Sequence, residues 1–388
     1  MTDHTPKLTD HDILQHARAR LAPHLPLRAD GYLCTTSDLF NLLLGAAATR
    51  DSLESVCRDL TAAPNAATLR SYLNEQLRVE DLPTLEKQLN RALAAEIPPS
   101  IGAAPRDLAI DYHDRPYYGK TEQSEGLWMR AEARDGTTHF YRVATAYVIL
   151  KHRRVTLAIR FVVPESDTVG VLSDLLKDLT RLRIHCRRLF LDRGFAGVRV
   201  IRFLRHRHQP TVIACPIRGK QGGTRALCQG RKSYRTTYTF VSPQHGRAAA
   251  ELAVCRVFTT ARRTGRHPRR ADWMIFILIG LDWPPKRTRQ QYRRRFGIES
   301  SYRCARSVSG WTTSNNPAYR FVLIGVGFFL LNVWINLRWL VARRPRRGGR
   351  IMKAAHFRLR RFARFIVRAL EHLYGCIREI ESLSAQHL

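Results

Sequence analysis

The stretch RRLFLDRGFAGVRVIRFLRHRHQPTVIACPI, residues 187–217, decides the fold class. Residues 187–195 are an apolar strand that ends in Asp192 and runs into a turn. The apolar spacing of residues 196–207 is that of a helix, and residues 210–217 are a second strand. A strand, a helix and another strand in this order indicate an α/β sheet with helices packed on it.

The segment before this stretch belongs to the same pattern. We expect three strands and a helix there, at residues 107–111, 139–150, 155–163 and 166–182. The helix begins with a Ser-Asp pair that can cap it. The resulting order over residues 106–217, β-β-β-α-β-α-β, predicts the first part of a core domain built on a mixed sheet.

Residues 218–285 interrupt the alternation and are interpreted as a β-rich insertion. A loop rich in Gly and Arg is followed by three expected strands, at residues 234–241, 250–260 and 272–283. The basic loop 261–270 separates the last two of them. Helical spacing returns at residues 286–308, so residues 286–342 are expected to add helices to the core.

The first 100 residues are expected to be a helical N-terminal region. The spacing predicts helices at residues 39–48, 52–60, 66–77 and 82–95. The second and third have the lengths of a helix-turn-helix, whose second helix would expose Thr68, Arg70, Ser71 and Asn74 to DNA. An ordinary helical bundle fits these residues equally well.

The C-terminal part contains one apolar segment and one basic segment. Residues 321–341 are long and apolar enough to span a membrane, but Asn332, Asn336 and Arg338 interrupt them. We therefore favour a buried core helix over a membrane span. Residues 343–388 form a basic region, with an exposed hinge at 343–350 and an amphipathic helix at 351–381 that is a candidate for dimer or DNA contacts.

Charge favours nucleic acid as the partner. The 388 residues include 65 Lys and Arg against 32 Asp and Glu, a formal net charge of +33. Basic residues occur along the whole chain, which indicates an extended surface for a polyanion rather than one targeting patch. Eight cysteines without CxxC pairs indicate free thiols in a reducing compartment. With a polar N-terminus, these features predict a cytoplasmic, nucleoid-associated protein.

Three acidic residues stand out in this basic chain. Asp111 and Asp192 each end an apolar strand, and Glu299 lies in the expected helix at 286–308. Carboxylate oxygens are the ligands that Mg²⁺ prefers. Two such ions, about 3.5–4 Å apart, can activate the attacking oxygen and stabilise the leaving oxygen in phosphoryl transfer. The trio therefore predicts metal-dependent chemistry on phosphodiesters.

The segment around Glu299 resembles a known family. Tyr292-x2-Arg295-x3-Glu299-x6-Arg306 is similar to the YREK signature of DDE-type insertion-sequence transposases, with Arg306 where the family usually has Lys. AIDYHDRPYYG and FLDRGF, residues 109–119 and 190–195, resemble the contexts of the family's two Asp residues. The interval from the second Asp to the Glu is long, as in the subgroup with a β-rich insertion. The resemblance covers roughly residues 106–340.

The resemblance implies a ribonuclease-H-like core and a DNA transposase. It implies two Mg²⁺ or Mn²⁺ ions held by Asp111, Asp192 and Glu299. The DNA partners would be the terminal inverted repeats and the target duplex, and a homodimer would bind them. No membrane partner is expected. Cut-and-paste excision would pass through a hairpin, with Tyr292 and the two signature arginines holding phosphates. These side chains fall on one stripe if residues 292–306 are a continuous helix.

Several assignments remain open at this stage. An unstacked nucleotide needs an aromatic platform, for which Trp273 and Trp283 are candidates, although each fits a small packed core as well. Trp311 is expected to be structural. Asp107 and Asp114 compete with Asp111, which is preferred because its context matches the family. Two other functions are considered: a transposase-derived DNA-binding protein without transposition activity, and a membrane-anchored basic protein.

Overall fold

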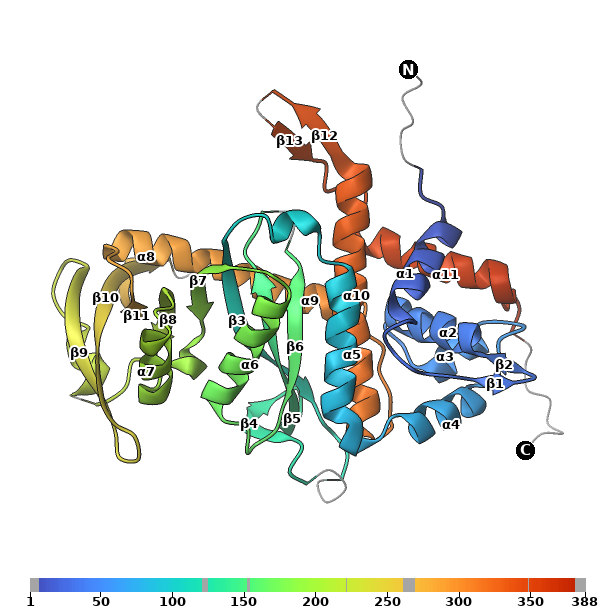
Figure 1. The fold of residues 1–388 in the computed structure, drawn as a ribbon, viewed down its shortest axis with the longest axis horizontal. Coiled ribbons are helices and arrows are strands. Elements are labelled where there is room, and N and C mark those ends of the chain that lie inside the picture. Colours follow the sequence, from blue (N-terminus) through green and yellow to red (C-terminus); the bar gives the residue numbers. More distant parts are fainter. Residues whose placement is uncertain are drawn as a thin grey trace. The chain divides into compact units, whose positions relative to one another are not determined.

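The computed structural model describes residues 7–120, 125–151, 154–220, 222–260, 269–347 and 349–380 (Figure 1). They divide into two compact units. Unit 1 comprises residues 1–98, 114–142 and 301–388, and unit 2 comprises residues 99–113 and 143–300. Most of the basic loop expected at 261–270 lies outside the described residues.

Within the described residues, the main sheet contains nine strands. They are β3 (Arg106–Pro116), β4 (Met129–Arg134), β5 (Thr137–Val148), β6 (Thr156–Val162), β7 (Cys186–Leu191), β8 (Thr211–Cys215), β9 (Tyr234–Ser242), β10 (Gly246–Thr260) and β11 (Arg269–Ile279). The strand order is β4-β5-β3-β7-β8-β11-β10-β9, and β6 pairs with β5. The mixed α/β sheet expected from the sequence is therefore confirmed.

The parallel part of this sheet ends beside two of the expected acids. Asp111 was expected to end its strand, but β3 continues to Pro116, so Asp111 lies inside the strand, one residue beyond the parallel pairing with β7. β3 pairs with β7 in parallel, and β7 pairs with β8 in parallel. Helix α6 (Thr168–Arg181) connects β6 to β7, and α7 (Val198–His206) connects β7 to β8. Leu189, Phe190 and Leu191 of β7 are buried, as an apolar strand covered on both faces requires. This burial places the residue that follows, Asp192, at the carboxyl edge of the sheet.

The strands of the segment 218–285 extend the main sheet. β11 pairs antiparallel with β8, β10 with β11, and β9 with β10. The register pairs Ile275 with Cys215 and Ile279 with Thr211, so the insertion continues the core strand by strand. The expected β-rich composition is present, as additional strands of the main sheet.

The helix expected to be continuous over residues 286–308 is broken. Helix α8 (Pro285–Tyr292) is followed by a 3₁₀ turn at Arg293–Phe296 and then by α9 (Gly297–Arg306). The prediction of one uninterrupted stripe was therefore wrong. A 3₁₀ segment has three residues per turn, so it changes the direction in which the side chains before and after it point.

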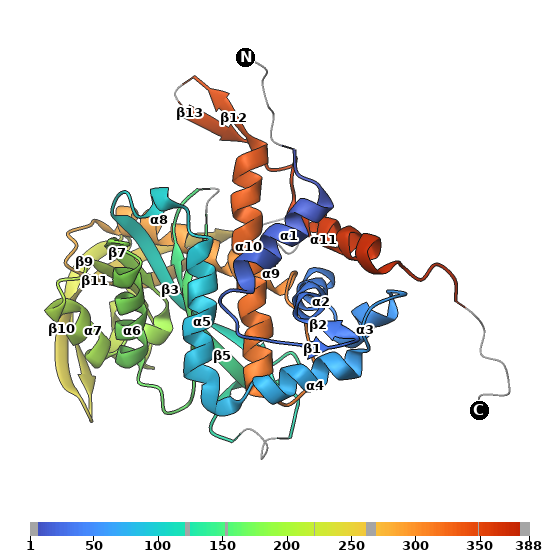
Figure 2. The same ribbon diagram turned by 45° about the vertical axis from the view of Figure 1, so that its right-hand side comes forward.

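Unit 1 is mainly helical. Its N-terminal helices are α1 (Asp10–Leu21), α2 (Thr36–Thr49), α3 (Leu53–Arg58), α4 (Ala66–Gln76) and α5 (Leu82–Ala95), with a short ribbon of β1 (Asp30–Gly31) and β2 (Cys34–Thr35). Helix α10 (Pro317–Ala342) packs along α5, and both views show the two side by side (Figures 1 and 2). The helical N-terminal region expected from the sequence is present.

The apolar segment forms the core helix of unit 1. Of the described helices, α10 alone is long and apolar enough to cross a membrane, and 94% of its most apolar window is buried. Its polar residues have partners within the unit. Asn336 donates to the Glu96 carboxylate at 2.9 Å, and Trp334 donates to the Phe357 carbonyl oxygen at 3.1 Å. Protein packing thus surrounds this helix, as expected for the buried core helix that the sequence favoured over a membrane span.

Two predictions for the C-terminal region were wrong. The expected hinge at 343–350 contains a hairpin of β12 (Arg343–Arg346) and β13 (Gly349–Met352). The expected helix at 351–381 is shorter, α11 (Leu359–Tyr374). Its apolar residues Phe362, Ile366 and Leu370 are buried, and α11 packs on α1 and α2. This apolar face is therefore used inside unit 1.

Gly325 allows the close packing of α5 and α10. A Cβ atom at this position would lie 2.6 Å from the Leu89 methyl carbons of α5. We expect Gly325→Val to lower the free energy of unfolding by about 1–3 kcal/mol, because overpacking forces buried helices apart. Gly197→Ala is the control, since a Cβ at residue 197 meets nothing within 4 Å. Urea denaturation of both variants measures this effect, and equal stabilities would contradict it.

Candidate active site

Three carboxylates of unit 2 converge on one guanidinium group, that of Arg295. Arg295 Nη1 lies 2.7 Å from Asp111 Oδ2, and Arg295 Nη2 lies 3.2 Å from Asp192 Oδ1. The same Nη2 is 3.8 Å from Glu299 Oε1. β3, the turn after β7 and the first turn of α9 supply the three acids. Acids that are far apart in the sequence thus surround a single cation.

Local packing explains how the turn after β7 is held beside β3. Asp192 has extended backbone and begins the 3₁₀ turn Arg193–Phe195. The buried Phe195 ring stacks on Tyr112 of β3, with centroids 4.7 Å apart and planes 9° apart. Because Tyr112 follows Asp111 and Phe195 closes the Asp192 turn, this stack brings the two acids to neighbouring positions at the sheet edge.

Arg295 is fixed by aromatic rings as well as by the acids. Its guanidinium carbon lies 5.3 Å from the centroid of the Tyr292 ring and 5.9 Å from that of Phe296. Tyr292 is buried, and its hydroxyl donates to the Leu191 carbonyl oxygen at 3.1 Å. Tyr292 therefore links α8 to the end of β7 and supports Arg295. Burial raises the pKa of Tyr292, so this hydroxyl stays protonated at neutral pH.

The three acids differ in exposure. Asp111 is buried, the Asp192 side chain is 36% exposed, and that of Glu299 is 53% exposed. Burial raises the pKa of Asp111 to about 6, although the Arg295 charge opposes the rise. Two of the acids can therefore reach solvent, while the third is held in the interior.

The donor set suits a hard divalent cation. Carboxylate oxygens are the ligands that Mg²⁺ and Mn²⁺ prefer, and the three acids already face one positive charge. Within the described ranges, no three His, Cys, Asp or Glu side chains lie close enough together to hold one ion in common. Arg295 occupies the point at which the oxygens meet, so an ion bound there would compete with its guanidinium group.

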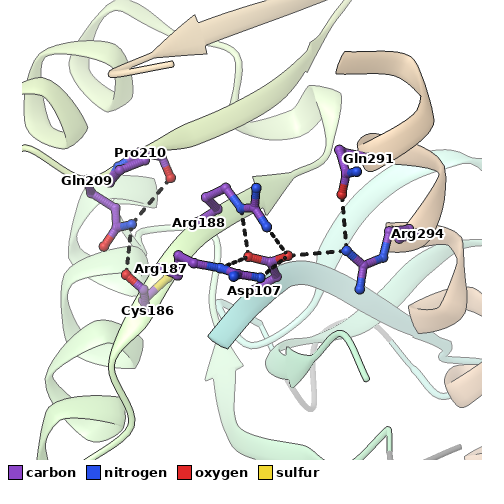
Figure 3. A network of polar contacts seen from close by, with 8 residues as sticks. All are labelled: Asp107, Cys186, Arg187, Arg188, Gln209, Pro210, Gln291 and Arg294. Atoms are coloured by element: carbon purple, nitrogen blue, oxygen red, sulfur yellow. Dashed lines mark hydrogen bonds and ion pairs between the residues drawn. The ribbon is translucent and has the colours of Figure 1, made fainter. Parts of the chain in front are cut away.

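Asp107, the first alternative to Asp111, is ion-paired with arginines (Figure 3). Its carboxylate accepts hydrogen bonds from Arg187 and Arg188 at 2.7–3.1 Å, and Arg294 Nη1 lies 3.4 Å away. The side chain is only 1% exposed. Asp114, the other alternative, is paired with Arg134 and Arg142 in unit 1. Asp111 is the acid of the three that faces Asp192.

The other residues predicted for DNA contact lie in different places. Tyr292 and Arg295, expected to hold phosphates, are 2% and 4% exposed. Arg306, Arg70 and Asn74 are exposed in unit 1. Arg306 donates to the Asp114 carbonyl oxygen at 3.3 Å, and Arg70 pairs with Glu54 at 3.2 Å.

The tryptophan candidates also differ. Trp273 is half-buried on β11. Trp283 is buried, with the guanidinium carbons of Arg188 and Arg287 5.1 and 5.0 Å from its ring centroid. Trp311, expected to be structural, is 48% exposed.

The sequence predicted Arg295 as a phosphate-holding residue on one helical stripe with Glu299, because side chains four residues apart on a helix are neighbours. Its position between all three acids was missed, since nothing local in the sequence places Asp111 and Asp192 beside it. Since the intervening 3₁₀ turn keeps Arg295 and Glu299 at 3.8 Å, the spacing rule still holds across the break.

Comparison with known proteins identifies the fold. No protein-family profile matches the sequence, and no curated protein does. Among solved structures, the fold is similar to that of the piggyBac transposase in its synaptic complex with hairpin DNA. The TM-score is 0.58 at 11% sequence identity, and the match covers 97% of this chain and 82% of the other. The fold is ribonuclease-H-like. At this identity, the likeness concerns the fold alone.

Proposed function

We propose that this protein is a DDE-type DNA transposase that cleaves the ends of an insertion sequence and joins them to target DNA. The observation that carries the proposal is the convergence of Asp111, Asp192 and Glu299 at the edge of a ribonuclease-H-like sheet. Asp192 follows the parallel strand β7, and Asp111 follows the part of β3 that pairs with β7 in parallel, near the end of the sheet where ligand sites of open α/β sheets lie.

Asp111, Asp192 and Glu299 would hold two Mg²⁺ or Mn²⁺ ions. When bound, such ions supply a nucleophilic oxygen and stabilise the leaving 3′-oxygen of the DNA strand. The residues of this chain orient the scissile phosphate and balance charge. Arg295 would keep the three acids together before the ions arrive, because a guanidinium group satisfies several carboxylate oxygens at once.

Double-stranded DNA is the proposed partner, at the terminal inverted repeats and at the target. A net charge of +33 favours a polyanion. The structural neighbour was determined as a synaptic complex with hairpin DNA, which supports a cut-and-paste reaction with a hairpin intermediate. Two protomers that bring the ends together are part of the proposal. The alternative, a DNA-binding protein derived from a transposase, predicts DNA binding without cleavage.

The direct test is cleavage of end DNA by the purified protein. The substrate is a duplex that contains the inverted repeat found beside the gene, with a scrambled repeat as the control. We expect nicking and then hairpin formation that require Mg²⁺ or Mn²⁺ and stop on chelation. Binding without any cleavage in either metal would favour the derived DNA-binding protein instead.

Helix α4 is proposed to contact DNA through Arg70 and Asn74. Both side chains are exposed, and neither belongs to the acid site. We expect the double substitution Arg70→Ala and Asn74→Ala to weaken binding of inverted-repeat DNA by about tenfold or more, within the about 1–3 kcal/mol typical of a base contact. Lys87→Ala, an exposed charge on α5, is the control. Unchanged affinity in a fluorescence-anisotropy titration would assign α4 to the helical bundle alone.

A further inference from the structure

A pocket in unit 1 has features of a nucleotide site that the acid trio does not explain. Its volume is about 580 Å³, within the about 300–1,000 Å³ typical of small-molecule sites. The end of β3, residues 118–119 that follow it and the stretch that leads into α10 form the walls. All residues that line it belong to unit 1.

The described lining of the pocket is basic. Arg115 and Arg320 line it, and among the residues that the structure describes no Asp or Glu does. Two more arginines, Arg50 and Arg306, are close enough to act on Arg115. Burial, together with the charges of Arg306, Arg50 and Arg320, lowers the pKa of Arg115 to about 10. Three like charges around a half-buried guanidinium group are a costly arrangement unless an anion joins them.

The polar partners of these arginines are neutral. Arg115 donates to the Ser309 hydroxyl at 3.2 Å, Arg306 to the Asp114 carbonyl oxygen, and Arg320 to the Ser314 carbonyl oxygen at 2.7 Å. In the part of the chain that the structure describes, none of the four is paired with a carboxylate. The Asp114 carboxylate is taken by Arg134 and Arg142. The guanidinium donors that remain fit phosphate oxygens.

An aromatic ring borders the same pocket. Trp311 is 48% exposed, and its ring nitrogen donates to Asp51 Oδ1 at 3.1 Å. The hydrogen bond of the Trp311 backbone nitrogen to the Asp51 carbonyl oxygen holds the same residue a second time. Asp51 itself does not line the pocket. A tryptophan held by its polar edge with an exposed face is a platform on which a base can stack.

Glycine keeps the cavity open at one wall. A Cβ atom at Gly119 would lie 2.4 Å from the Tyr117 hydroxyl and 2.6 Å from the Asn315 side-chain oxygen. The Tyr117 ring also lies against Arg320, whose guanidinium carbon is 5.6 Å from its centroid. Gly119 therefore gives Tyr117 and Asn315 room beside the arginine that would face a phosphate.

We propose that this pocket binds one unpaired nucleotide, with its phosphate on Arg115 and Arg320 and its base on Trp311. The volume matches a single nucleotide, and a base-paired duplex is too large to enter it. The source of this nucleotide, an unpaired stretch of the DNA substrate, rests on the proposed function. The chemistry of binding does not depend on that function.

The test is a metal-free binding titration with a fluorescent single-stranded hexathymidine and, separately, a fully paired duplex. Relative to the wild type, we expect Arg115→Gln and Trp311→Ala each to weaken hexathymidine binding by about tenfold, within the range of base stacking on an aromatic ring. Trp311→Phe should retain most of the affinity, and duplex binding should change by less than about threefold. Arg78→Gln, an exposed charge outside the pocket, is the control.

Three outcomes would overturn the proposal. One is unchanged hexathymidine binding in both variants, another is an equal loss for hexathymidine and duplex, and the third is a normal affinity of Trp311→Ala, which would leave a phosphate site without a base. If Arg115→Gln does not fold, as judged by circular dichroism, Arg320→Gln and the two Trp311 variants decide. Because no metal is present, this binding assay is independent of cleavage. A wild-type protein that cuts no DNA but shows this binding pattern would contradict the proposed function and still support the nucleotide pocket.

Discussion

Asp192→Asn is expected to lower cleavage of inverted-repeat DNA by on the order of a thousandfold or more, about 4 kcal/mol of transition-state stabilisation at 1.36 kcal/mol per tenfold. Asparagine keeps the size of the side chain and removes the negative charge that a divalent ion needs. Asp192 lies at the end of β7, is 36% exposed and hydrogen-bonds to Arg295 at 3.2 Å. The loss should therefore fall on chemistry and leave the fold intact.

DNA affinity separates this effect from a binding defect. We expect Asp192→Asn to bind the same DNA within about threefold of the wild type, since removal of one acid does not weaken attraction to phosphates. Asp167→Asn is the matched control, because Asp167 is 41% exposed and pairs with Arg199 on the surface. Asp167→Asn should cleave normally. Cleavage by Asp192→Asn at the wild-type rate would remove this acid from the proposed catalytic site.

Asp107→Asn is expected to lower the free energy of unfolding by about 3 kcal/mol at pH 7, near the low end of the range for breaking a buried ion pair. Asp107 is 1% exposed and faces three guanidinium groups, of which Arg187 and Arg294 are about half-exposed. Their exposure reduces the effect through solvent screening, but Arg188 is only 16% exposed and would lose its counterion in the interior. Urea denaturation measures the difference.

The same substitution has a predictable pH dependence. Burial alone would raise the pKa of Asp107, but hydrogen bonds and charges of Arg188 and Arg187 outweigh it and hold the pKa below its usual value. A depressed pKa means that the stabilisation is complete above the unfolded-state pKa of about 3.9 and is lost as pH falls through the lower folded-state pKa. The gap between wild type and variant should thus narrow below about pH 4. Asp174→Asn, at a 36% exposed acid, should cost less than about 1 kcal/mol. An equal gap at pH 7 and pH 3 would contradict this account of Asp107.

Local sequence patterns predicted the helices and strands whose apolar spacing is visible within the segment itself. The helix expected at residues 82–95 has those bounds, and the strand expected at 187–195 becomes β7 and its turn. β4 was missed because its sequence, MRAEAR, is mostly exposed and has no apolar face. Its place in the sheet comes from pairing with β5, which no local pattern reveals.

The position of residues 234–279 within the main sheet could not be predicted from the sequence either. Their strand character was predicted, but pairing of β11 with β8 joins residues about 60 positions apart. The candidate site shows the same limit. Strand ends and helix spacing identified Asp111, Asp192 and Glu299 as candidates, while the position of Arg295 among them depends on the 3₁₀ turn before α9. That turn replaces a helix that periodicity predicted to be continuous.

The most direct measurement of the proposed metal centre is iron-mediated cleavage of the polypeptide. Fe²⁺ in place of Mg²⁺, with ascorbate and peroxide, releases radicals that cut the backbone next to the bound ion. Asp111, Asp192 and Glu299 as ligands predict fragments that end near these three residues, suppressed by excess Mg²⁺ and absent in Asp192→Asn. Fragments that end elsewhere, or the same fragments in Asp192→Asn, would show that these acids do not hold the metal.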